Sequence, residues 1–297
     1  MACDAQPTLK RELRAKKDGH THTRTKGAAV SGELGGGGAG GVLPCVATQG
    51  YNSGMARTRI KICGITRAED AVMAAELGAD AIGLNFVGGP RMIDVAAARQ
   101  IVRMLPPLVT PVALLIERDA EHQDAPSFQD IREGGAIHGY TPLGISTFQL
   151  YGKHAIADDL RERITCWRVC HVAADRDLTE QIWNALQGAF GGAVFFPQVL
   201  LLDTAVKGQL GGSGVTFDWR RLVESQGILA QHMQLPRFGL AGGLNAANVG
   251  EAIRIARPYA VDVSSGVEVA GKPGIKDAAK MRDFIQAVRA ADDALGS

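Results

Sequence analysis

The chain has 297 residues, 46% of them hydrophobic, and its 32 basic and 31 acidic side chains leave a formal charge of +1. This is an ordinary globular composition, and it gives no reason to expect nucleic acid or a membrane surface as a partner. No apolar run reaches the roughly 18 residues that cross a bilayer. The five cysteines have no regular spacing, which indicates a reducing compartment, so we expect a cytoplasmic protein.

The first 57 residues differ in composition from the rest. A basic stretch at Lys10–Lys17 is followed by the run "GELGGGGAGG", and neither a helical nor a strand period is present. Such a segment lacks the apolar surface that offsets chain entropy, so we expect residues 1–57 to be a disordered extension. Met55 stands just before the first expected strand, which leaves open a start assigned too early. A folded domain is predicted over residues 58–297.

From residue 58 onward, short apolar runs alternate with amphipathic helical stretches. The expected strands are residues 59–63, 81–86, 111–116, 145–150, 166–172, 198–203, 237–241 and 260–265. The expected helices are residues 67–79, 94–105, a weaker stretch at 128–133, then 155–164, 178–190, 219–232, 245–256 and 277–291. Asp94 and Asn245 are predicted to start their helices.

Eight strand-then-helix units in roughly 240 residues predict a (β/α)8 TIM barrel, a single-domain α/β fold. A doubly wound open sheet is the alternative. No glycine-rich dinucleotide-binding turn follows the first expected strand, which favours the barrel. The third unit has the weakest helical pattern.

The carboxyl ends of barrel strands carry the active site in proteins of this fold, so the residues found there are the first candidates. Cys63 ends the first expected strand and Asp203 ends the sixth, while Arg91 follows the second in "VGGPR". Gln149, with Tyr151 close behind it, ends the fourth. A thiol, a carboxyl group and an arginine on one rim suit acid–base chemistry on a phosphorylated small molecule. The alternative interpretations are that Cys63 is a core thiol, that Asp203 is a turn residue and that Arg91 is a solvent-exposed loop residue.

Two small-residue turns predict a phosphate site on the same rim. Gly242 and Gly243 follow the seventh strand in "AGGLN", and Ser264, Ser265 and Gly266 follow the eighth. Glycines let backbone N–H groups approach an anion, and a helix N-terminus adds favourable partial charge. The alternative is that these glycines only make tight turns.

Strand alternation predicts a buried ion pair below this rim. Lys61 and Cys63 share one face of the first strand, and Asp262 and Ser264 share one face of the last. First and last strands are neighbours in a closed barrel. We therefore expect Lys61 and Asp262 to lie inside the barrel as partners, because a buried ammonium group needs one.

Six motifs resemble those of the phosphoribosylanthranilate isomerase family of tryptophan biosynthesis. They are "KICGIT", "GLNF…PR", "FQLYG", "LLLDT…GGSGVTFDW", "AGGLN" and "VDVSSGVE", and the match runs in order from about Arg59 to about Val288. Residues before Thr58 have no counterpart. Tyr151 departs from the family pattern, which generally has histidine there.

The resemblance implies a cofactor-free Amadori rearrangement of N-(5'-phosphoribosyl)anthranilate to 1-(2-carboxyphenylamino)-1-deoxyribulose 5-phosphate, without a metal. It implies Cys63 as general base, Asp203 as general acid and Arg91 as the group that binds the anthranilate carboxylate. The "GGSG" loop, which contains Gly212, is expected to close over the substrate. Monomers and homodimers suit this fold equally.

Two conditions follow for the acid and the base. Cys63 needs cationic or dipolar neighbours that favour its thiolate, whereas Asp203 needs a carboxyl pKa raised by burial or by nearby negative charge.

Several other functions remain open. One is an isomerase of histidine biosynthesis, or a dual-substrate relative. Such enzymes have an aspartate at each of the two catalytic strand ends, and Cys63 argues against this alternative. A lyase or synthase of the same pathway would call for a lysine or glutamate at the working rim. A degenerate phosphate-binding barrel without turnover, or a sugar-phosphate isomerase with shifted substrate, is the remaining alternative.

Overall fold

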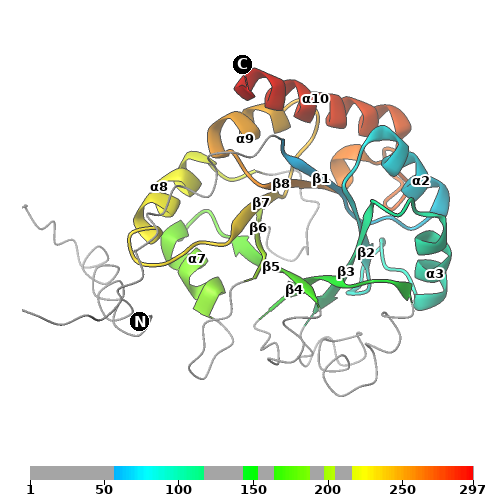
Figure 1. The fold of residues 1–297 in the computed structure, drawn as a ribbon, viewed down its shortest axis with the longest axis horizontal. Coiled ribbons are helices and arrows are strands. Elements are labelled where there is room, and N and C mark those ends of the chain that lie inside the picture. Colours follow the sequence, from blue (N-terminus) through cyan, green and yellow to red (C-terminus); the bar gives the residue numbers. More distant parts are fainter. Residues whose placement is uncertain (1–56, 117–142, 153–163, 188–196, 205–215, 297) are drawn as a thin grey trace, which may run out of the picture. The chain divides into compact units, whose positions relative to one another are not determined.

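The computed structural model describes residues 57–116, 143–152, 164–187, 197–204 and 216–296. Its centre is a closed barrel of eight parallel strands in which each strand pairs with the next and β8 pairs with β1 (Figure 1). The strands are β1 (Arg59–Ile62), β2 (Ala81–Asn85), β3 (Thr110–Ile116), β4 (Thr147–Tyr151), β5 (Thr165–Val172), β6 (Val199–Thr204), β7 (Arg237–Ala241) and β8 (Ala260–Val263). The predicted barrel is confirmed.

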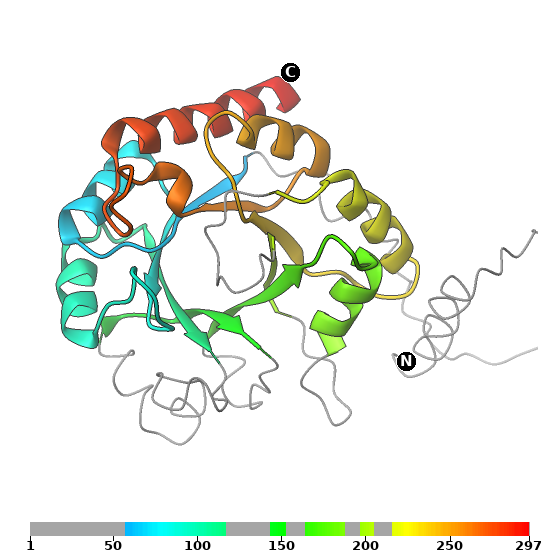
Figure 2. The same ribbon diagram turned by 180° about the vertical axis from the view of Figure 1, so that it is seen from behind.

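The described helices lie on the outside of the barrel, as the view from behind also shows (Figure 2). The described helices are α2 (Ala68–Leu77), α3 (Val95–Met104), α7 (Leu178–Gln187), α8 (Arg220–Leu229), α9 (Val249–Ala256), α10 (Ala278–Gly296) and the short 3-10 helix η2 (Ser265–Val267). The helices expected at 128–133 and 155–164 lie outside the described residues, as does the extension expected at 1–57 apart from Arg57. The last helix, α10, packs against both α9 and α2 and so links the last and first described helices around β8 and β1.

The helix starts show how local chemistry sets the loops near the rim. Asp94 caps α3 as predicted, because its side chain accepts a hydrogen bond from the backbone N–H of Ala97 at 2.7 Å. The prediction that Asn245 starts the next helix is wrong. Its side chain accepts from the N–H of Ala247 at 2.9 Å and forms a tight turn instead. Helix α9 therefore begins only at Val249, farther from Gly243 than expected.

The barrel interior follows from strand alternation and register. Lys61 lies beside Asp262 in the β1–β8 ladder, and both side chains are buried. Cys166 and Cys170 on β5 are buried as well. These buried side chains hold the strands in place, and the residues at the carboxyl ends of the strands can contact a ligand.

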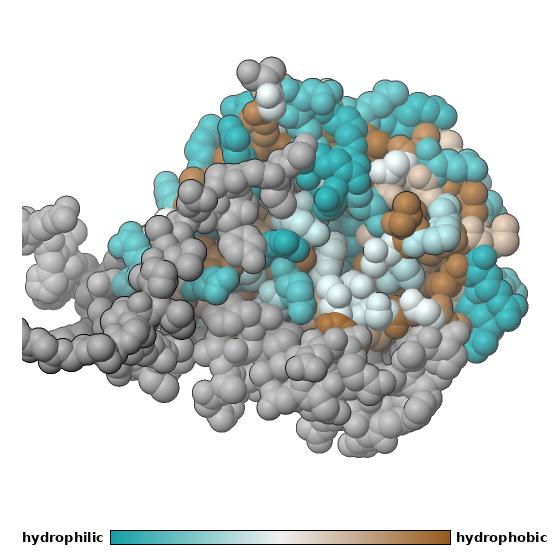
Figure 3. All heavy atoms as spheres, viewed as in Figure 1, coloured by the Kyte–Doolittle hydropathy of each residue, from teal (hydrophilic) through white to brown (hydrophobic). Residues whose placement is uncertain are grey.

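The outer surface is polar where the last two helices lie. In the space-filling view, hydrophilic residues cover much of the outer edge formed by α9 and α10 (Figure 3). Within the described parts of the chain, no helix is both long and apolar enough to cross a membrane.

Candidate active site

A cavity of about 570 Å³ opens at the carboxyl ends of the strands. That volume is in the range of sites that hold small-molecule ligands. Its walls come from β2, β3, β4, β6, β7 and β8 and from the segments that follow β1, β2, β7 and β8. The lining residues include Cys63, Asn85, Arg91, Leu114, Tyr151, Asp203, Gly242, Gly243, Asp262, Ser264 and Ser265.

The structure brings seven of the ten predicted site residues to this one cavity. They are Cys63, Arg91, Asp203, Gly242, Gly243, Ser264 and Ser265. Gln149 and Gly266 are not among the lining residues. Gly266 packs against the loop after β7, where an added Cβ would lie 2.1 Å from the carbonyl oxygen of Leu244. Gly212 lies outside the described residues.

Gln149 supports the cavity wall from below. Its side chain is 1% exposed, and its amide Nε2 donates to the hydroxyl of Tyr151 at 2.8 Å. The Tyr151 ring lines the cavity and stacks on His171, with ring centroids 5.7 Å apart. Burial raises the pKa of Tyr151 well above its usual value, so its hydroxyl stays neutral. The tyrosine that departs from the family pattern is therefore a fixed part of the wall.

The Cys63 thiol lies just beyond β1, and its backbone N–H continues the ladder to the carbonyl of Val263 at 2.8 Å. The residue is 8% exposed and faces the cavity. Burial raises the pKa of the Cys63 thiol, and the nearby Asp262 carboxylate raises it further. The ammonium groups of Lys61 and Lys276 act in the opposite direction. The expected cations are present, but burial outweighs them and the resting group is a neutral thiol.

The Asp203 carboxyl group is buried, and one of its oxygens accepts no hydrogen bond from the described residues. It is 5% exposed, and its Oδ1 has no hydrogen-bond partner among the described residues. Burial raises the pKa of this carboxyl to about 7, with a smaller contribution from Asp262. An aspartate with such a pKa can hold a proton near neutral pH and give it to a ligand.

Gly242 allows the β7 loop to pass close to this aspartate. Its φ is +81°, in the left-handed region that side chains disfavour. An added Cβ would lie 2.5 Å from the backbone nitrogen of Thr204 and 2.8 Å from Oδ1 of Asp203. The glycine is therefore required by close approach as well as by backbone conformation.

Lys61 and Asp262 form the predicted ion pair inside the barrel. Nζ of Lys61 lies 2.9 Å from Oδ1 of Asp262, and the lysine is fully buried. Each partner offsets the desolvation of the other. Cys63 sits directly above on the same strand face, so this pair forms the floor beneath the thiol.

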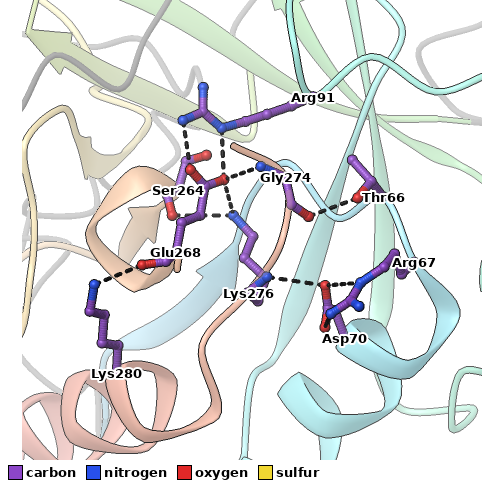
Figure 4. A network of polar contacts seen from close by, with 9 residues as sticks. All are labelled: Thr66, Arg67, Asp70, Arg91, Ser264, Glu268, Gly274, Lys276 and Lys280. Atoms are coloured by element: carbon purple, nitrogen blue, oxygen red, sulfur yellow. Dashed lines mark hydrogen bonds and ion pairs between the residues drawn. The ribbon is translucent and has the colours of Figure 1, made fainter. Parts of the chain in front are cut away.

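A second charged cluster holds Arg91 (Figure 4). Its Nε and Nη2 each donate to one carboxylate oxygen of Glu268 at 2.8 Å, a bidentate pair with fixed geometry. Glu268 also accepts from Nζ of Lys276 at 2.9 Å and from the N–H of Gly274 at 3.0 Å. Although burial opposes it, these donors lower the pKa of Glu268 to about 2. Nη1 of Arg91 has no hydrogen-bond partner among residues 57–116 and 216–296, and the arginine lines the cavity.

This cluster also ties three loops of the rim together. Lys276 donates from Nζ to the carbonyl of Ser264 at 3.2 Å and from its backbone N–H to Asp70 at 3.1 Å. Lys280, on α10, donates to the carbonyl of Glu268 at 2.7 Å. The arginine after β2 is thereby connected to the turn after β8 and to the first turn of α2.

Sequence reasoning missed Glu268 and Lys276. Glu268 stands inside "VDVSSGVE", so the motif contained the signal, but nothing in the spacing pairs it with Arg91, 177 residues away. Lys276 follows in a segment without period. Asn85 ends β2 and its Oδ1 accepts from the N–H of Val87 at 2.8 Å, which shapes the loop toward Arg91.

Comparison with known proteins identifies the family. A sequence model described as N-(5'-phosphoribosyl)anthranilate isomerase matches residues 137–287. A protein named N-(5'-phosphoribosyl)anthranilate isomerase from Pseudomonas aeruginosa (strain LESB58) is 41% identical over 236 residues, which is 79% of this chain and 97% of the relative. The chain belongs to the N-(5'-phosphoribosyl)anthranilate isomerase family. A relative of the same name from Acidithiobacillus ferrooxidans is 43% identical over 236 residues, 79% of this chain and 99% of the relative.

Solved structures of the family share the fold. The crystal structure of phosphoribosyl anthranilate isomerase from Thermotoga maritima aligns with a TM-score of 0.61 at 32% identity, covering 78% of this chain and 99% of that one. A family structure in complex with reduced 1-(o-carboxyphenylamino)-1-deoxyribulose 5-phosphate aligns with a TM-score of 0.58 at 30% identity, covering 78% and 99%. Within the part of this chain that the structure describes, no group of three or more His, Cys, Asp or Glu residues could hold a metal ion.

Proposed function

We propose that this chain converts N-(5'-phosphoribosyl)anthranilate to 1-(2-carboxyphenylamino)-1-deoxyribulose 5-phosphate, the reaction after which its relatives are named. The observation that carries the proposal is the shared cavity, which Cys63 and Asp203 line from strands far apart in the sequence. A family structure that holds a reduced form of this product supports a phosphorylated small molecule as ligand.

Asp203 acts as the general acid. Its protonated carboxyl gives a proton to the furanose ring oxygen as the bond from that oxygen to C1 breaks, which leaves a protonated imine between C1 and the anilino nitrogen. The raised pKa supports this role, because the group must carry a proton near neutral pH.

Cys63 acts as the general base in the next step. Its thiolate removes the proton from C2, the C2–H electron pair forms a double bond to C1, and the electrons of the imine return to nitrogen. The resulting enol then loses its hydroxyl proton and gains one at C1, which yields the ketose. No atom is gained or lost, as an isomerisation requires.

The two ends of the substrate are held by separate groups. Arg91 binds the anthranilate carboxylate with the donors that Glu268 leaves free, since a guanidinium fork matches a carboxylate. Gly242, Gly243, Ser264 and Ser265 bind the phosphate from two neighbouring turns. Gly212 belongs to the loop expected to cover the substrate.

Complementation of a tryptophan auxotroph that lacks the isomerase tests this proposal. The wild-type chain should restore growth, whereas Cys63→Ala and Asp203→Ala should not. Cys170→Ala and Asp218→Ala are matched controls, because these residues do not line the cavity, and they should rescue like the wild type. Rescue by both site variants would refute the assignment of acid and base. Failure of the folded wild type would indicate a binding barrel without turnover.

A further inference from the structure

The ammonium group of Lys61 lies directly beneath the Cys63 thiol. The two residues alternate on one face of the first strand, and Lys61 has no exposed surface. Its Nζ is held at 2.9 Å from Oδ1 of Asp262 on β8. A lysine held in this way cannot swing out to solvent, so its charge has a fixed position relative to the sulfur.

Gly83, on the neighbouring strand β2, shows how close the thiol and the ammonium group come to one another. A Cβ added at this glycine would lie 2.6 Å from Sγ of Cys63 and 3.1 Å from Nζ of Lys61. The Cys63 sulfur and the Lys61 ammonium nitrogen therefore both border the space that the missing side chain of Gly83 leaves open, and they lie close to one another.

We propose that Lys61 is a positioning residue for the isomerisation: its ammonium group stabilises the thiolate of Cys63, and Asp262 limits that stabilisation. This inference rests on the proposed role of Cys63 as base. The charged and titratable groups around the thiol come from several elements. They are Lys61 from β1, Asp262 from β8, Lys276 from the segment after η2, Arg91 from the loop after β2, Tyr151 from β4 and Asp203 from β6.

The electrostatic directions agree with this arrangement. Burial raises the pKa of the Cys63 thiol and the Asp262 carboxylate raises it further, whereas Lys61 lowers it by charge and by hydrogen bonding. Lys276 also lowers it, to a smaller extent, from a position where its ammonium group is bound by Glu268 and by the carbonyl of Ser264. Lys61 is the cation on the same strand face as the sulfur, so it has the larger effect on the thiolate.

A purely structural role explains the ion pair less well. Replacing a buried ion pair with apolar side chains of similar volume is often neutral or stabilising, so packing alone gives no reason for charges in the barrel floor. A neutral floor would leave the Cys63 thiolate, once formed, without a cation beneath it. The pair lies one layer below the proposed base, where the ammonium group can stabilise the Cys63 thiolate.

The test is the pH dependence of Cys63 alkylation by iodoacetamide, followed peptide by peptide with mass spectrometry on the full chain. Only the thiolate reacts, so the rate reports the thiol pKa without any substrate. Lys61→Met should raise the apparent pKa of Cys63 by about 1–3 units, the range expected when a close opposite charge is removed. At neutral pH this means alkylation roughly tenfold slower or more. Asp262→Asn should shift the pKa in the opposite direction and speed alkylation.

The opposite signs separate electrostatics from damage to the fold. Unfolding would expose Cys63 in both variants and move both rates in one direction. Cys170 is 3% exposed, so its peptide reports intactness of the barrel in every sample. Should Lys61→Met fail to fold, the double variant Lys61→Met/Asp262→Asn leaves no unpaired charge, and its Cys63 pKa should exceed that of Asp262→Asn alone.

Unchanged alkylation in Lys61→Met, or equal shifts in both single variants, would overturn the inference. Because the readout needs no turnover, it is independent of the proposed reaction. A wild type that alkylates as expected but fails to isomerise would refute the function and leave the thiol electrostatics standing. A wild type that isomerises while Lys61→Met keeps the same thiol pKa would refute the inference alone.

Discussion

Asp203→Asn should change both the rate and the shape of the pH profile. Burial raises the pKa of Asp203 to about 7 and raises that of Cys63 above its ordinary value, so the acid has the lower pKa of the two. The working form has Asp203 protonated and Cys63 deprotonated. Because the base has the higher pKa of the two, only a small fraction of the enzyme is in that form at any pH.

This order of pKa values fixes which group produces which limb. Between the two values the working fraction is constant, so kcat/KM should be flat. Below about pH 7 Asp203 is already protonated and the thiolate of Cys63 becomes scarcer, so kcat/KM falls. Without the acid, the Asn variant should lose about 100-fold to 10,000-fold in kcat/KM, the usual contribution of a general acid. Its remaining activity should rise steadily through pH 7 until Cys63 is deprotonated.

Initial rates with N-(5'-phosphoribosyl)anthranilate from pH 5 to 10 give both profiles. A bend near pH 7 that persists in Asp203→Asn would refute the assignment, because the group that causes it would then be another.

The same carboxyl should also lower stability. Its folded pKa lies above its unfolded value of about 3.9, so stability is lost as pH rises from about 4 to 7. Asn should recover up to about 4 kcal/mol at pH 8 in urea unfolding, and nothing at pH 3.

Three further substitutions test the supports of the site. Gly242→Ala should lower stability by about 1–2 kcal/mol or more in urea unfolding and displace Asp203, because its φ is +81° and its Cβ would meet backbone at 2.5 Å. Gly227→Ala, in α8 with nothing within 4 Å, is the control and should stabilise by about 0.5–1 kcal/mol. Glu268→Gln should raise KM about tenfold with a smaller effect on kcat, since one charge-assisted contact to Arg91 is weakened; an unchanged KM would contradict the clamp. Gly83→Ala should reduce kcat strongly while the barrel still folds, because its Cβ would lie 2.6 Å from the Cys63 sulfur.

Strand alternation and the strand-end rule account for the part of the site that the sequence predicts. Cys63 and Asp203 were found because each follows a buried apolar run, and parallel strands bring their carboxyl ends to one edge. The Lys61–Asp262 pair was found because the period of two is rigid and the first and last strands of a barrel are neighbours. In these cases backbone geometry, rather than side-chain detail, fixes the position.

The parts that escaped prediction depend on side chains in loops. Glu268 grips Arg91 across the rim, yet neither stands in a periodic element that would reveal the contact. Gln149 shares the inward face of β4 with Tyr151, but alternation alone does not tell that one layer reaches the cavity and the other stops below it. Asn245 has the residue type of a helix cap and instead forms a turn, because a side chain that bonds its own backbone suits both.

Charge in the two clusters gives the site a further constraint. Counting only the side chains paired directly with Asp262 or Glu268, and with Asp203 protonated as in the working form, the cations Lys61, Arg91 and Lys276 face two carboxylates, so one positive charge is in excess while Cys63 is a neutral thiol. Forming the thiolate cancels that excess, and so would a substrate carboxylate at Arg91. Both anions together would leave the site negative, in surroundings where burial already disfavours charge. Substrate binding at Arg91 should therefore make the Cys63 thiolate a stronger base, one that takes the C2 proton more readily once the ring has opened.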